Sequence, residues 1–321
     1  MREIRRDPLS GRWVTLSTER VPAELLPPPS PRQPAAECPF CPGHEQATEP
    51  EIARIGRDGR WVARAFPNRR PALVIEEELH HRGAGPYDRI TGTGAHEVIV
   101  ECRDHDVPLW DQPATQLRDA LELARCRLDD LRKDPRFRSI WWFRNHGAPA
   151  GASVDHPHAQ ILATPHVPSV LERMVRRSRR FQRERGRELL QDVLDYERES
   201  GRRLVWEGER IVAFCAWAPM SPFEVWFVPA APSASFVGSD DRLVEELAVG
   251  MRFVLRQMAR VLRGPAHNAW LYDAPQGVPA PGFRWHMRLA PKIVRGAGYE
   301  VASGDAVHWV FPEEAAAALR G

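Results

Sequence analysis

The stretch His156-Pro157-His158-Ala159-Gln160 follows the small, polar run Gly151-Ala152-Ser153-Val154-Asp155. Residues i and i+2 share one face of a β-strand, so a strand here places His156, His158 and Gln160 on the same side. One imidazole can attack phosphorus, one can bind a metal, and the amide can donate to a phosphoryl oxygen. A pair of surface histidines on a solvated strand is the alternative. The flanking Gly/Ser loop and the apolar continuation Ile161-Leu162-Ala163 favour the phosphoryl-transfer site.

The order His-Pro-His-x-Gln resembles the active-site strand of the histidine-triad superfamily, in the form found in its galactose-1-phosphate uridylyltransferase branch. The resemblance runs from Arg5 to about Arg320. It implies an α+β fold of two histidine-triad-like halves, with mostly antiparallel sheets and flanking helices. We expect the first half, with the HPHAQ strand, at residues 1–190, and the second at residues 191–321.

The second half is expected to lack the nucleophile, because His286 and Arg288 stand where His156 and His158 stand in the first half. Hydrophobic periodicity predicts helices at about 113–133 and 241–262. An Arg/Glu-rich stretch at 170–203 is expected to form a largely solvated helix, and its interleaved acids disfavour a nucleic-acid surface. The expected strands are 12–16, 96–101, 140–143, 211–214, 224–229, 269–271 and 285–290.

Composition limits the classes of function. The 321 residues carry a net charge of +2, which gives no basic field for a nucleic-acid partner. No apolar run approaches the ~18 residues that span a bilayer, so no membrane partner is expected. The first residues lack the apolar segment of a signal peptide, so the cytoplasm is the expected compartment. Five cysteines, an odd number, argue against a secreted disulfide scaffold.

The pair Cys38-x-x-Cys41 is ambiguous by itself, because it could be a redox pair, two incidental cysteines or half of a zinc site. Its Pro-rich loop makes the redox interpretation weak. The family resemblance supplies two further ligands, His105 and His156. It therefore implies one structural zinc ion per protomer, which fixes the start of the strand that carries His158.

Some members of the family hold a second metal in the C-terminal half, bound by several histidines and a glutamate. Only His286 persists here, and the other matching positions are Tyr272, Arg288 and Met174. We therefore expect the second metal to be absent.

The resemblance assigns nucleophilic attack to His158 and hydrogen bonding of the transferred group to Gln160. A covalent histidine intermediate divides the transfer between two anionic substrates into two displacements. Ser153 is expected to bind the leaving phosphate. By the same resemblance, Arg20 and Asn145 are expected to contact phosphate, and Asn68 the nucleotide. Glu300 is expected to contact the hexose hydroxyls. Neither a Walker loop nor a pair of catalytic carboxylates is evident in the sequence.

The predicted reaction is ping-pong uridylyl transfer between a nucleotide sugar, UDP-glucose, and a sugar 1-phosphate such as galactose 1-phosphate, in a homodimer. Three departures from the family pattern, at Arg69, at Asp155 and over 301–304, look more like a shorter subfamily that includes ADP-glucose phosphorylase-type enzymes. An ADP-sugar phosphorylase or adenylyltransferase, or a pathway-specific sugar-1-phosphate nucleotidyltransferase, is therefore the alternative. The non-enzymatic alternative is an idle nucleotide-binding scaffold, against which the intact His158/Gln160 pair counts.

Overall fold

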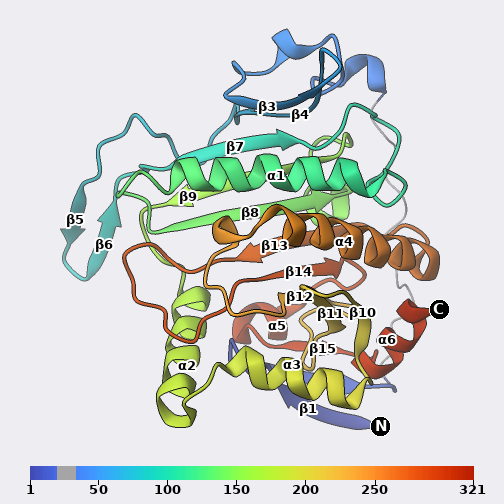
Figure 1. Cartoon of the computed structure of the whole chain (residues 1–321). Helices are drawn as coiled ribbons and strands as arrows, with labels where there is room; N and C mark the ends of the chain where they lie inside the picture. Colours follow the sequence, from blue (N-terminus) through green and yellow to red (C-terminus); the bar gives the residue numbers. More distant parts are fainter. Residues whose placement is uncertain (20–33) are drawn as a thin grey trace.

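A computed structural model describes residues 1–19 and 34–321 of the chain (Figure 1). Its centre is one ten-stranded sheet in the order β10-β11-β12-β14-β13-β8-β9-β7-β4-β3, with every neighbouring pair antiparallel. The α+β prediction is confirmed. The strands are β3 (Ala53–Arg57), β4 (Arg60–Pro67), β7 (Ala95–Val100), β8 (Ser139–His146), β9 (His158–Thr164), β10 (Leu204–Glu207), β11 (Ile211–Cys215), β12 (Val225–Pro229), β13 (His267–Tyr272) and β14 (His286–Pro291).

Five strands of this sheet come from residues 53–164 and form one side of it, and five come from residues 204–291 and form the other. The two sides meet where β8 pairs with β13, with Asn145 directly opposite Asn268. The two predicted halves therefore share a single continuous sheet. The predicted boundary after residue 190 falls within α3 (Leu189–Ser200) and stays a prediction.

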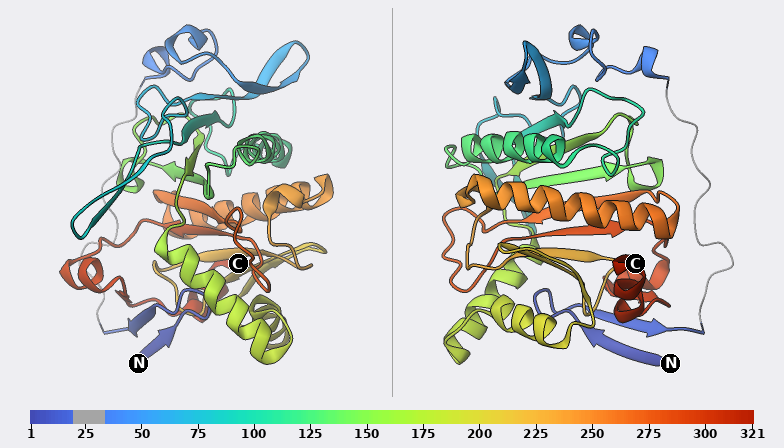
Figure 2. Two further views of the ribbon diagram at one scale, coloured as in Figure 1. Left: turned by 90° about the vertical axis from the view of Figure 1, so that its left-hand side faces the viewer. Right: turned by 45° about the vertical axis from the view of Figure 1, so that its right-hand side comes forward.

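Two long helices cover one face of the sheet, α1 (Ala114–Leu131) and α4 (Asp241–Leu262), and they lie side by side (Figures 1 and 2). Both match the predicted helices closely. The Asp240 side chain accepts from the Leu243 N–H and so caps the start of α4. Apolar side chains recur every three or four residues along α4 and fill the core against the sheet, among them Val244, Leu247, Met251, Val254 and Met258.

Alternation along the strands separates the two faces of the sheet. Ile211 and Ala213 of β11 join the core under α4, whereas Val212 and Phe214 face a second apolar cluster. That cluster receives α2 (Ser169–Arg185) and α3. The helix predicted at 170–203 is present as two helices, because Gly186 ends α2 in a left-handed conformation. Each buries one narrow apolar face and leaves most of its side chains at least partly in water, so the prediction of a largely solvated segment holds and that of one continuous helix does not.

A three-stranded sheet joins the two ends of the chain: β1 (Arg2–Arg6), β2 (Trp13–Ser17) and β15 (Ala306–His308), which pairs with β2 in parallel. The helices α5 (Gly298–Ser303) and α6 (Pro312–Arg320) flank β15, and the hairpin β5 (His81–Ala84)–β6 (Tyr87–Ile90) extends away from the main sheet (Figure 1). Within the described ranges, no helix combines the length and apolarity needed to cross a bilayer.

Candidate active site and metal centre

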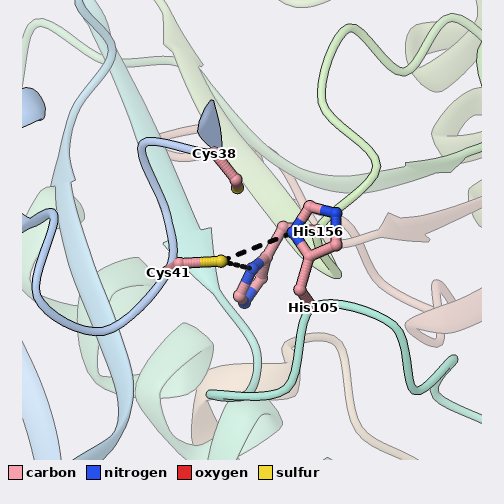
Figure 3. A group of neighbouring side chains, drawn as sticks. All are labelled: Cys38, Cys41, His105 and His156. Atoms are coloured by element: carbon pink, nitrogen blue, oxygen red, sulfur yellow. Dashed lines mark hydrogen bonds between the residues drawn. The ribbon is translucent and has the colours of Figure 1, made fainter. Parts of the chain in front are cut away.

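Four metal-ligating side chains converge beside the start of β9 (Figure 3). Cys38 and Cys41 come from the knuckle before β3, His105 follows β7, and His156 directly precedes β9. Their ligand atoms all lie within 4.8 Å of one another, and all four residues are buried. The Cys41 Sγ atom is 3.5 Å from Nδ1 of both His105 and His156. A tetrahedral zinc ion, with Zn–S ~2.3 Å and Zn–N ~2.0 Å, requires roughly this spacing.

The surroundings of the cluster keep the histidine neutral, and they make a thiolate unfavourable unless a cation is bound. His156 Nε2 donates to the main-chain oxygen of Cys102 at 2.8 Å, which leaves Nδ1 unprotonated toward the cluster. Burial lowers the pKa of His156 to about 4, so the ring is neutral at pH 7. Burial and, next, Cys38 raise the pKa of the Cys41 thiol to about 11. Two adjacent thiolates therefore need a bound cation, and this donor set fits zinc.

His158 is the first residue of β9 and lies beside an open cavity of about 540 Å³. Its Nδ1 donates to the main-chain oxygen of His156 at 2.8 Å, so Nε2 keeps its lone pair. Burial lowers the pKa of His158 to about 4, so this ring is also neutral at pH 7. A neutral, oriented imidazole is the form that can attack phosphorus.

The prediction that His156, His158 and Gln160 share one face of a strand is only partly right. The strand begins at His158, and His156 precedes it and directs its ring to the metal cluster. His158 and Gln160 do share a face, and both line the cavity. Asn68 and Ser153 line it too, so four predicted site residues lie together.

The remaining predicted residues lie elsewhere. Asn145 sits on β8 beside β9, where its amide oxygen accepts from Asn268 Nδ2 at 2.8 Å. Glu300 lies on α5 and lines a second cavity of about 390 Å³, together with Lys292 and Asn268. The structure therefore does not bring Glu300 to the cavity beside His158. Arg20 lies outside the described residues.

Two residues of the site were not predicted from the sequence. His96 Nε2 lies 2.8 Å from Gln160 Oε1, and Asn268 holds Asn145 as described above. No motif in the sequence assigns a role to His96. Its relation to Gln160 depends on the register of β7 on β9, where Val98 is opposite Gln160, and no single motif carries that information.

The positions that correspond to the second metal surround a guanidinium group instead. Arg288 Nη1 lies 3.3 Å from Asp7 Oδ2 and 3.4 Å from Glu224 Oε1, and the guanidinium stacks on Trp226 at 3.9 Å. Tyr272 contacts the same guanidinium at 4.9 Å. A fixed cation therefore already faces the carboxylates of this cluster. The absence of a second metal remains a prediction.

Comparison with known proteins assigns the family. Residues 1–168 match the model of the galactose-1-phosphate uridyl transferase N-terminal domain. The chain belongs to this family. A galactose-1-phosphate uridylyltransferase of Streptomyces lividans is 30% identical over 99% of this chain and 86% of the relative. An ADP-glucose phosphorylase of Arabidopsis thaliana is 29% identical over 99% of this chain and 92% of the relative.

Solved structures of the galactose-1-phosphate uridyl transferase family share the whole architecture. An ADP-glucose phosphorylase from Arabidopsis thaliana with bound ADP-glucose superimposes with a TM-score of 0.86 at 28% identity, covering 100% of this chain and 99% of that chain. A uridylyltransferase structure superimposes with a TM-score of 0.77 at 26% identity, covering 100% and 97%. The predicted resemblance is confirmed, and so is the prediction that the protein is an enzyme of the nucleotidyl-transfer class.

Proposed function

We propose that this protein is a UDP-glucose–hexose-1-phosphate uridylyltransferase that forms a covalent intermediate on His158. The observation that carries the proposal is the hydrogen bond from His158 Nδ1 to the His156 main-chain oxygen, because it leaves a neutral Nε2 beside the cavity. Nε2 attacks the α-phosphorus of UDP-glucose, a P–N bond forms, and the P–O bond to glucose 1-phosphate breaks. A phosphate oxygen of galactose 1-phosphate then attacks the same phosphorus, the P–N bond breaks, and UDP-galactose leaves.

The residues around His158 take the predicted roles. Gln160 hydrogen-bonds the transferred phosphoryl group, and Ser153 binds the leaving phosphate at the mouth of the same cavity. Asn68 contacts the nucleotide. We also propose phosphate contacts by Asn145 and by Arg20, and hydrogen bonds from hexose hydroxyls to Glu300, which lines the second cavity and not the one beside His158.

Zinc has a structural role in this proposal, with one ion per protomer held by Cys38, Cys41, His105 and His156. Four protein ligands leave no open coordination position, which is typical of structural sites. The ion fixes the main chain at His156, whose carbonyl sets the tautomer of His158. We also propose, from the family resemblance, a homodimer in the cytoplasm. Analytical ultracentrifugation and cell fractionation test these two points.

ADP-glucose phosphorolysis is the second candidate. The observation that favours it is the higher TM-score, 0.86 against 0.77, with the ADP-glucose phosphorylase than with the uridylyltransferase. In this case His158 Nε2 attacks the α-phosphorus of ADP-glucose, a P–N bond forms and glucose 1-phosphate leaves. An oxygen of inorganic phosphate then attacks the same phosphorus, the P–N bond breaks and ADP leaves. The chemistry on His158 is the same, and the base and the acceptor differ.

Intact-protein mass spectrometry separates these possibilities. The protein is incubated separately with UDP-glucose, ADP-glucose and GDP-mannose, without an acceptor, beside the variants His158→Ala and His80→Ala. A uridylyl adduct on wild type and on His80→Ala, absent from His158→Ala, supports the proposal, since His80 is exposed. An adenylyl adduct moves the function to the phosphorylase. An adduct on His158→Ala, or none with any donor, overturns the proposed intermediate.

A further inference from the structure

We infer that His96 and Asn268 are positioning residues that fix the side-chain amides of Gln160 and Asn145, so that each NH2 group is turned away from its positioning residue and can donate to a phosphoryl oxygen. The inference rests on the proposed function, because it concerns the amides assigned to the phosphoryl groups. In each case a main-chain group fixes the hydrogen-bonding role of the positioning residue, and the positioning residue then fixes which end of the amide it contacts.

The orientation of Gln160 follows from the main chain at Ala72. The Ala72 N–H donates to His96 Nδ1 at 3.2 Å, so Nδ1 carries no proton. A neutral His96 ring must then carry its proton on Nε2. Nε2 is 2.8 Å from the Gln160 side chain, so the atom that it meets is the acceptor, Oε1. The Gln160 NH2 group is therefore directed away from His96.

Asn68 supports the same orientation. The Arg70 N–H donates to Asn68 Oδ1 at 2.9 Å, so the Asn68 NH2 group is the end that turns inward. That nitrogen lies 3.4 Å from Gln160 Oε1 and 3.3 Å from His96 Nε2. Because Nε2 is protonated, the acceptor for Asn68 is Gln160 Oε1. Two donors thus meet the Gln160 oxygen, and neither can accept from an inverted amide.

A main-chain oxygen orients Asn145 in the corresponding way. Asn268 Nδ2 lies 2.8 Å from the main-chain oxygen of Ala150, an acceptor only, so this end of Asn268 is its NH2 group. The same NH2 group lies 2.8 Å from the Asn145 side chain, which must present Oδ1 to it. The Asn145 NH2 group therefore points toward the loop at Gly151. A Cβ atom added to this glycine would lie 3.7 Å from the Asn145 nitrogen.

The orientation of the amides matters because the phosphoryl group is negatively charged. The oxygens of a phosphoryl group only accept hydrogen bonds. An amide therefore stabilises the group when its NH2 faces it, and repels it when its carbonyl oxygen does. Without a positioning residue, a free amide samples both orientations. Removing an oxyanion donor outright costs about 10²–10³ in rate. An amide that populates both orientations equally presents NH2 about half of the time, so releasing its orientation should cost between about twofold and that limit.

A double-mutant cycle on the rate of adduct formation at His158 tests the inference. The variants are His96→Phe, Gln160→Leu and the pair, with His80→Phe as the matched control on an exposed histidine. We expect His96→Phe to slow single-turnover adduct formation by about twofold or more, but by less than Gln160→Leu does, with a smaller change in the dissociation constant of the nucleotide sugar. In the Gln160→Leu background the same change should cost little, because no amide remains to be oriented.

A conservative variant separates positioning from folding. Gln at position 96 can accept from the Ala72 N–H and donate to Gln160, so His96→Gln should recover most of the rate that His96→Phe loses. If His96→Phe lowered the rate by the same factor in wild type and in Gln160→Leu, or did not lower it at all, the role of His96 would be overturned. The cycle of Asn268→Leu with Asn145→Leu examines the second pair in the same way. Absence of any adduct on wild type would instead refute the proposed function, and so the two failures are distinguishable.

Discussion

The Nδ1 atom of His158 donates to the main-chain oxygen of His156, and His156 itself contributes a ring nitrogen to the metal cluster. The candidate nucleophile is therefore one hydrogen bond away from a metal ligand. His156 is fixed at its other ring nitrogen as well, because Nε2 donates to the Cys102 main-chain oxygen. A metal ion held by this cluster would stabilise the segment that sets the tautomer of His158, although none of the four ligands lines the cavity.

Loss of one zinc ligand should therefore lower both stability and adduct formation. Cys38→Ser removes a buried thiolate ligand, and we expect the variant to lose bound zinc and to unfold roughly 10 °C lower. Elemental analysis of the purified protein and thermal unfolding measure the two effects. Cys126→Ser is the matched control, because Cys126 is exposed and outside the cluster. Unchanged zinc content in Cys38→Ser would remove Cys38 from the ligand set.

The buried guanidinium of Arg288 provides a second prediction. Arg288 is 2% exposed and lies between Asp7 and Glu224, whose carboxylates have equally little access to water. Burial raises the pKa of Glu224, and Arg288 opposes that shift. Arg288→Met leaves both carboxylates buried without a cation, so we expect a loss of about 3–5 kcal/mol in the free energy of unfolding. Urea denaturation measures it.

The control for Arg288 is an exposed ion pair of the same type. Arg180 binds Glu184 one turn later on α2, with both side chains largely in water. Arg180→Met should therefore cost less than about 1 kcal/mol. If Arg288→Met were no more costly than Arg180→Met, the buried pair would not be a stabilising contact between β14 and the N-terminal turn.

Several parts of this molecule could be predicted from sequence because their signals are local. The helix at 241–262 has a capping aspartate and an unbroken apolar stripe, and its predicted bounds match α4. The zinc ligands were predicted through a family resemblance that is itself carried by short motifs. These signals need no knowledge of which strands are neighbours.

The parts that sequence analysis missed depend on contacts between distant residues. Strand β1 carries Arg5, which is buried against residues far away in the sequence: Glu313 of α6 binds it at 3.0 Å and the Trp217 ring stacks on it at 4.0 Å. His96 acts on Gln160 only in the observed register of β7 and β9. Such relations follow from tertiary packing, and a residue pattern within one segment cannot contain them.

A buried histidine away from the active site should make stability depend on pH. His308 donates from Nε2 to the Pro219 main-chain oxygen, and burial lowers its pKa from 6.5 to about 4. The unfolded chain therefore binds a proton between these values that the folded chain does not, so stability falls as the pH drops from 6.5 toward 4. His308→Gln keeps a donor for Pro219 and does not titrate.

Urea denaturation of both proteins at several pH values between 4 and 7.5 tests this prediction. The free energy of unfolding of wild type should fall more steeply with acidification than that of His308→Gln. The difference between the two slopes should correspond to the uptake of up to about one proton on unfolding. Other buried histidines, His267 and His286 among them, contribute equally to both proteins and cancel in the comparison. Parallel curves would contradict the prediction. They would mean that His308, although buried against β2, gains its proton as readily in the folded protein as in the unfolded chain.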